Sequence, residues 1–200
     1  MPSNILYHKI LPMGEFRTFD SKPDLEVART TQIHSKNLAV YKGQKLDKEE
    51  ADGIFFKRAA LKTKKTAVAV TTADCMPILF IGDESGVFLH AGWKGLSQGI
   101  LKNPLIKDAS PKYCLIGPSI SLEAFEVQKD FYEHFPEKEF FHKIKGKTHF
   151  DLKAKARRDI LDEFPEIQLE IAPECTLRQR EYHSYRRDKT KERNWNIFSL

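Results

Sequence analysis

Three apolar runs follow one another within residues 66–91, and they constrain the fold more than any other feature of the chain. The first, TAVAVT at residues 66–71, is β-branched or apolar throughout, which is typical of a strand covered on both faces. The other two flank a polar, glycine-containing turn in the segment MPILFIGDESGVFL. This pattern predicts two strands joined by a turn, within a layered domain.

Cys75 and His90 stand at the outer ends of this predicted strand pair. A strand pair brings its ends together, so a sulfur and an imidazole are expected to face one small space. The sequence therefore predicts metal binding or nucleophilic chemistry there. The alternative is a small buried cysteine and a histidine that satisfies a local hydrogen bond.

The rest of the pattern predicts an α+β or layered α/β domain. Residues 13–27 read as a loop, residues 57–65 as a basic connector and residues 140–147 as a basic loop or hairpin. Further strands are expected over residues 5–10, 38–41, 54–56, 113–116, 167–172 and 196–200, and helices over residues 96–102, 128–135 and 152–164, the last with Asp151 as N-cap.

Composition is that of one ordinary domain: 200 residues, 40% apolar, with 14 Phe for a core. No run of about 18 apolar residues predicts a membrane span, and the first residues lack a signal-peptide pattern. The odd count of 3 cysteines argues against a disulfide framework and for a reducing, cytoplasmic setting. The net charge of +5 favours anionic partners.

The C-terminal segment 178–193 interleaves arginines and lysines with Tyr182 and Tyr185. Basic and aromatic side chains together bind nucleic acid or a phosphate-bearing small molecule. The alternative is a solvated charged face, as in most charged runs.

Three single residues are weaker candidates. His34 stands near a predicted strand end, where it faces a cleft or is simply a surface histidine. Asp52 precedes Gly53 and fits an Asx-turn. Ser119 follows a Gly-Pro pair after the strand at residues 113–116, as an N-cap or a ligand hydroxyl.

Taken together, the segments TTADCMPILF, HAGWKGL, IGPSIS, FEV, FDL and CT with HSYRRDK resemble the YfiH-like family from about residue 32 to the C-terminus. Its members have been called laccase-domain proteins, polyphenol oxidases and purine nucleoside phosphorylases. The resemblance implies one domain over residues 1–200, in a layered α/β/β/α arrangement with a mixed β-sheet, similar to a cysteine-hydrolase-like fold.

The same resemblance implies site residues. His34, Cys75 and His90 match the family's metal ligands. The turn with Asp52 matches a site segment, and the SYRRD run places Arg186 and Arg187 near the pocket. Two nitrogens and one thiolate suit zinc with an open fourth position.

The implied activity is that of a zinc-dependent purine nucleoside enzyme. Its reactions are phosphorolysis of adenosine, inosine, guanosine or methylthioadenosine, a transferase reaction, and adenosine deamination, a hydrolase reaction that needs an activated water. Arg186 and Arg187 bind phosphate or form structural ion pairs. Asp52 or Asp74 orients a ligand imidazole or protonates a ring nitrogen.

Copper is disfavoured, because 7 histidines without a His-x-His pair do not supply a multicopper centre. Two alternatives remain open: a metal-free Cys75–His90 hydrolase, and a nucleic-acid-binding module on residues 178–193, which the modest charge disfavours. The expected partners are a purine nucleoside and phosphate, and the expected state is a monomer or homodimer. The chain departs from the family in a shortened N-terminal portion, in His183 where Phe is common, and in Glu192 before Arg193 where Gly is common.

Overall fold

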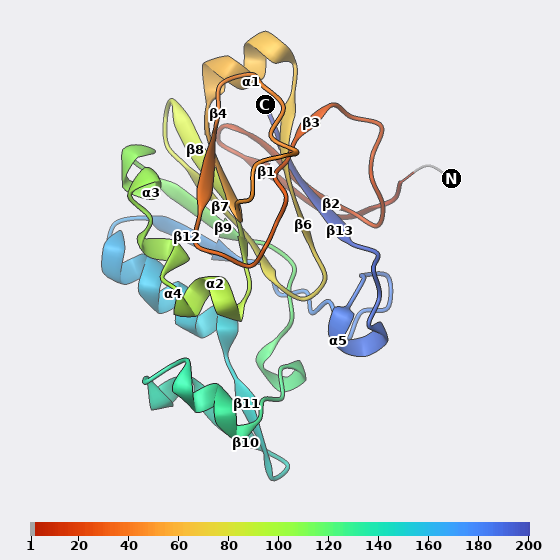
Figure 1. The fold of residues 1–200 in the computed structure, drawn as a ribbon, viewed down its shortest axis with the longest axis vertical. Helices are drawn as coiled ribbons and strands as arrows, with labels where there is room; N and C mark the ends of the chain where they lie inside the picture. The colour runs from red at the N-terminus through yellow and green to blue at the C-terminus, as the bar shows by residue number, and fades with distance from the viewer. Residues whose placement is uncertain (1–2) are drawn as a thin grey trace.

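The computed structural model describes residues 3–200 and consists of two mixed β-sheets packed face to face, with three of the helices covering the outer face of one sheet (Figure 1). The five-stranded sheet joins the two ends of the chain, because the N-terminal hairpin lies next to the last strand. Its strands in spatial order are β1 (Ile5–Leu11), β2 (Gly14–Phe19), β13 (Asn194–Ser199), β6 (Ala67–Thr72) and β3 (Val27–Ala28). All neighbours are antiparallel except β3 and β6.

The six-stranded sheet is centred on the predicted hairpin of β7 and β8. Its strands in spatial order are β12 (Gln168–Ile171), β9 (Tyr113–Ile116), β7 (Met76–Ile81), β8 (Ser85–Ala91), β5 (Gly53–Lys57) and β4 (Leu38–Tyr41). The outer pairs β4–β5 and β9–β12 are parallel, and the inner pairs are antiparallel. The α+β class with mixed sheets is therefore confirmed.

The apolar runs are buried because the sheets carry a core on each face. Phe16, Val68, Phe88 and Phe198 are among the residues that pack between the two sheets. On its other face the six-stranded sheet packs against a second cluster that includes residues of three helices, α2 (Trp93–Ser97), α3 (Pro104–Asp108) and α4 (Leu152–Glu163). Every residue of β7 is buried, as its unbroken apolar run predicts.

Shorter elements complete the chain. A hairpin of β10 (Phe141–Ile144) and β11 (Lys147–Phe150) extends from the body of the molecule (Figure 1). The small helices are α1 (Arg58–Lys64), α5 (Tyr185–Asp188) and the 3₁₀ turns η1 (Ile100–Lys102), η2 (Leu122–Ala124), η3 (Lys129–Glu133) and η4 (Lys138–Phe140). Among residues 3–200, no helix has the length and apolar character needed to cross a membrane.

The structure corrects four local predictions. The helix expected over residues 96–102 is instead the end of α2 and the 3₁₀ turn η1, separated by Gly99 in the left-handed conformation. Residues 14–19, expected in a loop, form β2, whose Phe16 and Thr18 are buried while its polar alternates face outward. Residues 58–64, expected as a connector, form α1, which has Leu61 as its one buried residue and so carries little periodic signal. The helix expected over residues 128–135 is only the 3₁₀ turn η3.

Candidate metal centre

The candidate site lies at the seam between the two sheets, that is, at the boundary where connecting segments run from one sheet to the other. His34 lies on the connection from β3 to β4, and Cys75 lies on the connection from β6 to β7. Both connections run from the five-stranded sheet to the six-stranded sheet. His90 is on β8, opposite Pro77 in the β7–β8 hairpin, and so beside Cys75.

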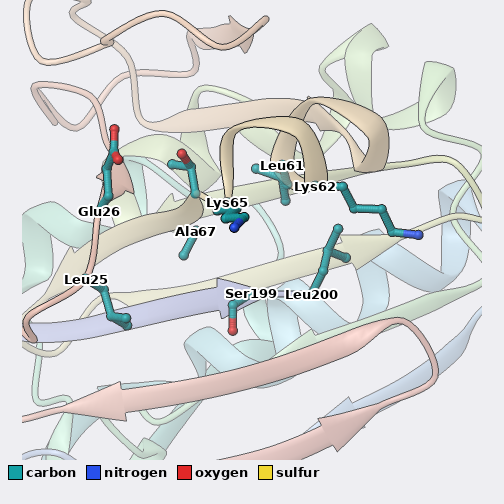
Figure 2. A pocket seen from close by; sticks show the side chains of 9 residues that line it. Leu25, Glu26, Leu61, Lys62, Lys65, Ala67, Ser199 and Leu200 are labelled. Carbon is teal, nitrogen blue, oxygen red and sulfur yellow. The ribbon is translucent and has the colours of Figure 1, made fainter.

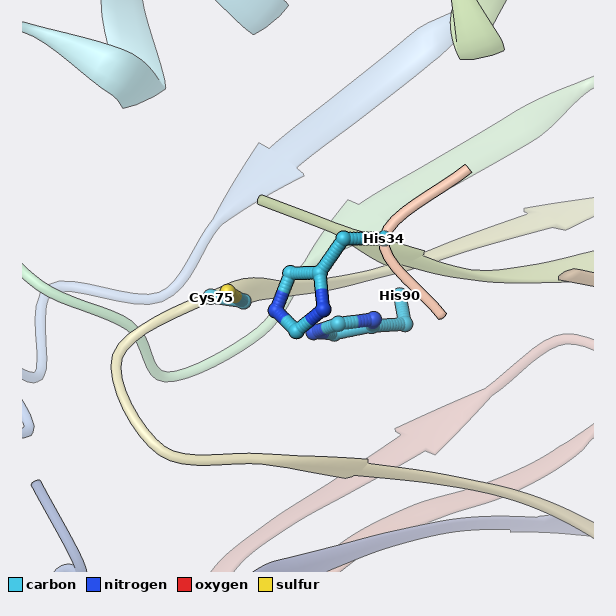
Figure 3. Close-up of side chains that lie close together, drawn as sticks. All are labelled: His34, Cys75 and His90. Carbon is cyan, nitrogen blue, oxygen red and sulfur yellow. The ribbon is translucent and has the colours of Figure 1, made fainter. Parts of the chain in front are cut away.

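These three side chains converge from their separate segments (Figure 3). Their ligand atoms all lie within 4.8 Å of one another. The imidazole rings of His34 and His90 meet edge to face, with centroids 4.8 Å apart. His90 is buried, Cys75 is half-buried and His34 is exposed, so the group opens toward solvent on the side of His34.

Asp52 fixes both histidines from behind. One carboxylate oxygen accepts from His90 Nδ1 at 2.8 Å and from the His34 backbone N–H at 3.0 Å. The other accepts from the Ser35 N–H at 2.5 Å and the Ser35 hydroxyl at 2.9 Å. Successive N–H groups that point at one anion form a nest, and here the left-handed backbone of His34, with φ 61°, completes it.

This carboxylate also sets the tautomer of His90. Burial raises the pKa of Asp52, but the hydrogen bonds from His90 and Ser35 outweigh burial and lower the pKa to about 2. An ionised carboxylate only accepts hydrogen bonds, so Nδ1 of His90 carries the proton. Nε2 of His90 is then the nitrogen that faces Cys75, and it can act as a ligand when a metal ion displaces its proton, as in carboxylate–histidine–metal arrangements.

Cys75 and His90 favour each other's charged forms. Burial raises the pKa of the Cys75 thiol, but the charge of His90 and hydrogen bonds from His34 and His90 lower that pKa to about 6. Burial lowers the pKa of His90, but the Cys75 thiolate and the hydrogen bond to Asp52 raise it to about 9. The sulfur is therefore poised as a thiolate, the form that binds metals and acts as a nucleophile.

The group fits a four-coordinate metal ion. Metal bonds of about 2.0–2.3 Å in a tetrahedron place ligand atoms about 3.3–3.8 Å apart, so the observed spacing closes with small side-chain rotations. Gly92 keeps the space open, because a Cβ at this residue would lie 2.7 Å from Cys75 Sγ and 3.5 Å from His34 Cδ2.

A cavity of about 870 Å³ lies in front of His34, Cys75 and His90, which we call the metal-ligating group because together they could hold a metal ion. Its lining combines cationic, aromatic and polar side chains with a single carboxylate. The residues are Arg29, Thr30, Thr31, Gln32, His34, Thr71, Ala73, Asp74, Cys75, His90, Trp93, Lys94, Ile120, Phe125, Tyr185, Arg186, Lys189 and Arg193.

Asp74 lines this cavity but is engaged with its own chain. Its two carboxylate oxygens accept from the Thr176 hydroxyl at 2.8 Å and from the Arg186 backbone N–H at 2.7 Å. Its carbonyl accepts from the Ile120 N–H at 3.0 Å. Asp74 therefore ties the Cys75 loop to α5, whereas Asp52 is the carboxylate that orients an imidazole.

The two adjacent arginines differ. Arg186 faces the cavity, with its guanidinium 5.0 Å from the centroid of the Phe125 ring. Arg187 points away and donates to the carbonyls of Thr176, Leu177 and Tyr182. Of the pair, Arg186 alone is among the cavity-lining residues in the described chain.

Two further candidates lie outside the cavity lining. The Ser119 hydroxyl is fully buried and has no hydrogen-bond partner among the described residues. His183 Nε2 lies 2.6 Å from the Asp20 carbonyl and so ties the C-terminal segment to the loop after β2.

Sequence reasoning gave no role to several residues that shape the site. The Gln32 side chain binds Thr71 at both backbone groups, with Nε2 donating to the carbonyl and Oε1 accepting from the N–H, each at 2.8 Å. Arg29, Lys94 and Phe125 line the cavity from distant parts of the chain. The one available signal was that Gly92, Lys94 and Phe125 stand within the quoted motifs HAGWKGL and FEV.

A smaller cavity of about 340 Å³ lies between α1 and the end of β13 (Figure 2). It carries two lysines and one glutamate but no histidine or cysteine. Its residues are Leu25, Glu26, Leu61, Lys62, Lys65, Thr66, Ala67, Ser199 and Leu200. Because it lacks the donor set described above, we place the candidate chemistry in the larger cavity.

Comparison with known sequences points to one family. The family model described as multi-copper polyphenol oxidoreductase laccase matches residues 16–199. A protein of Aquifex aeolicus named purine nucleoside phosphorylase is 36% identical over 134 residues, which cover 65% of this chain and 64% of that protein. The Escherichia coli protein named purine nucleoside phosphorylase YfiH is 33% identical over 174 residues, which cover 81% of this chain and 69% of that protein.

Solved structures give the same result for the fold. A crystal structure of a Neisseria meningitidis protein superposes with a TM-score of 0.72 at 33% identity, covering 88% of this chain and 75% of that one. The Bacillus licheniformis protein YfiH superposes with a TM-score of 0.73 at 24% identity, covering 87% of this chain and 74% of that one.

Proposed function

Because the chain belongs to the YfiH-like family, whose sequence model carries the laccase description, we propose that it catalyses phosphorolysis of purine nucleosides at His34, Cys75 and His90, with zinc as the bound metal. Relatives named purine nucleoside phosphorylase support a role in handling purine nucleosides. The matched segment spans about two thirds of their length, so the activity of the whole relatives is carried over here as part of the proposal.

One observation carries the proposal: a single cavity joins the metal-ligating group to cations and aromatic rings. Five basic side chains line it, namely Arg29, Lys94, Arg186, Lys189 and Arg193. Trp93, Phe125 and Tyr185 add aromatic surface. Cations are what phosphate requires, and apolar and aromatic surface is what a purine requires.

In phosphorolysis, a phosphate oxygen forms a bond to C1′ of the ribose while the bond from C1′ to N9 breaks. The purine leaves with the bonding electrons and takes up one proton. Arg186 and its cationic neighbours would hold the phosphate, while Asp52 holds the imidazole of His90. Zinc bound by the three ligands would supply Lewis acidity to a substrate oxygen or nitrogen.

Neither nearby carboxylate is placed to deliver the proton to the purine. Asp52 is fully buried, and its pKa is lowered to about 2. Asp74 accepts a hydrogen bond at each oxygen. Both carboxylates therefore fit positioning roles better than acid catalysis.

The ligand count argues against a multicopper oxidase. Of the 7 histidines, His34 and His90 line the cavity. His8 pairs with Glu15, His134 lies on Trp93, His149 bonds to the Lys147 carbonyl and His183 bonds to the Asp20 carbonyl, while His142 is exposed on β10. Two imidazoles and one thiolate support one metal ion rather than the several that a laccase uses.

The test is incubation of untagged protein with adenosine, inosine and methylthioadenosine, with and without phosphate. Free base, ribose 1-phosphate and ammonia are followed, and ammonia reports the deamination expected alongside. We expect base release that requires phosphate, and stoichiometric zinc that Cys75→Ala removes. Cys114→Ala, which changes a core cysteine away from the cavity, is the matched control.

Base release without phosphate, or zinc content unchanged in Cys75→Ala, would contradict the proposal. Metal-free protein whose activity still needs Cys75 would instead favour the Cys-His hydrolase.

A further inference from the structure

The cavity in front of the metal-ligating group holds positive charge that this chain does not neutralise. Its five basic side chains face one lining carboxylate, Asp74, whose oxygens already accept from Thr176 and Arg186. Among residues 3–200, none of the five forms a salt bridge. The chain has 28 acidic residues, so this arrangement does not follow from a shortage of them.

Aromatic rings hold four of these cations in place of acidic partners. Lys94 lies 5.6 Å from the centroid of the Trp93 ring, and Lys189 lies 4.9 Å from that of Tyr185. Arg186 lies 5.0 Å from the centroid of the Phe125 ring, and Arg29 lies 5.3 Å from that of Trp195. A cation over an aromatic face is held in place yet keeps its full charge for a ligand.

The cations also approach from two sides of the metal-ligating group. Lys94 follows His90 by four residues, on α2 beside the six-stranded sheet. Arg29 and Arg193 lie at strand ends of the five-stranded sheet, since Arg29 directly follows β3 and Arg193 directly precedes β13. One phosphate dianion, which carries about two negative charges, cannot neutralise five cations spread over two sides.

Building on the proposed function, we infer that the cavity binds a purine nucleoside that carries its own phosphate ester, such as a nucleoside 5′-monophosphate, together with inorganic phosphate. Two phosphates supply about four negative charges, close to the charge that the cavity presents. The cavity volume of about 870 Å³ suits a ligand of this size, near the upper end of the usual range of about 300–1,000 Å³. The bonds that form and break are those of the proposed reaction, and the sugar product is ribose 1,5-bisphosphate.

The test is calorimetric binding of AMP and of adenosine to the full chain in phosphate-free buffer, at low and high ionic strength. We expect AMP to bind about tenfold tighter than adenosine at low ionic strength, and high ionic strength to reduce this difference. The double variant Arg29→Ala with Arg193→Ala, which removes the two cations beside the five-stranded sheet, should bring the affinity for AMP to within about twofold of the affinity of the same variant for adenosine.

The matched control is the double variant Lys45→Ala with Lys145→Gly, which removes two cations from exposed positions outside the cavity. It should keep the preference for AMP. Equal affinities for AMP and adenosine, with phosphorolysis of adenosine intact, would overturn this inference and leave the proposed function standing. Tighter binding of AMP with no base release on addition of phosphate would overturn the proposed function and support the ligand class.

Discussion

Gly92 shows how a missing side chain leaves room for the proposed metal site. Its backbone, at φ −85° and ψ 177°, suits any residue. Only the contact of an added Cβ with Cys75 Sγ, at 2.7 Å, therefore requires glycine. Gly92→Ala should lower metal affinity by about tenfold or more, measured by competition with a chelator, with little change in the free energy of unfolding of the metal-free protein.

Gly99→Ala is the matched control for this prediction. Gly99 has φ +81°, and a Cβ there would meet nothing within 4 Å. The substitution should cost about 1–2 kcal/mol of stability from backbone strain and leave metal affinity unchanged. Equal loss of metal in both variants would mean that general destabilisation, and not the contact with Cys75, decides metal binding.

Arg186 and Arg187 are neighbours with opposite expected effects. Arg186→Ala should raise the KM for phosphate by about tenfold and cost less stability than Arg187→Ala, because its guanidinium lies on Phe125 at the cavity and donates to a single exposed carbonyl, that of Glu126. Arg187→Ala should cost about 1–3 kcal/mol of stability, because three carbonyls lose their donor. Steady-state kinetics and urea unfolding separate these effects, and a reversed pattern would show that the assignment of the two arginines is wrong.

At the scale of elements, the segment that carries His34 is fastened to β6 by one side chain. Gln32 binds the backbone N–H and carbonyl of Thr71, as a neighbouring strand would. Gln32→Ala should increase hydrogen exchange at residues 31–35 and weaken metal binding by about tenfold.

Gln44 is the matched control, because it makes the same two kinds of hydrogen bond, to the Lys42 N–H and the Val40 carbonyl, on an exposed turn. Gln44→Ala should leave metal binding unchanged, and a loss of metal there would contradict the fastening role.

Elements with strong periodicity could be predicted from the sequence. The β7–β8 hairpin and β9 follow from apolar runs, and α4 follows from its helical spacing, with the Asp151 carboxylate accepting from the Ala154 N–H at 2.9 Å as N-cap. Elements whose stability comes from tertiary packing could not be predicted. The β2 strand is held between β1 and β13, and β13 lies at the far end of the chain.

The candidate site could be predicted to the same limited extent. A hairpin is local, so the approach of Cys75 to His90 follows from the pattern of residues 76–91. The approach of His34 depends on the path of the β3–β4 connection and on its hydrogen bonds to Asp52. The hydrophobic periodicity of the sequence carries no information on either. His34 could be predicted as a ligand only from the resemblance to the family. The different orientations of Arg186 and Arg187 could not be predicted, because the sequence presents them as two equivalent neighbours.

At the scale of the whole molecule, the metal-ligating group joins the two sheets. His34 and Cys75 lie on connections that leave the five-stranded sheet, and His90 belongs to the six-stranded sheet. A metal ion at this seam would therefore oppose separation of the sheets. Ligand that binds the folded state alone stabilises it by about 2.7 kcal/mol at a concentration 100 times its Kd.

Removal of metal with a chelator should therefore lower the urea midpoint of the wild-type protein, and added zinc should restore it. Cys75→Ala should unfold at one midpoint with or without zinc, because one of the three ligands is gone. Lys45→Ala, which alters an exposed position outside the cavity, should respond to zinc as the wild type does. If zinc stabilised Cys75→Ala as strongly as the wild type, the ion would be binding elsewhere, and the seam would be held by packing and by the hydrogen bonds of Asp52 and Asp74 alone.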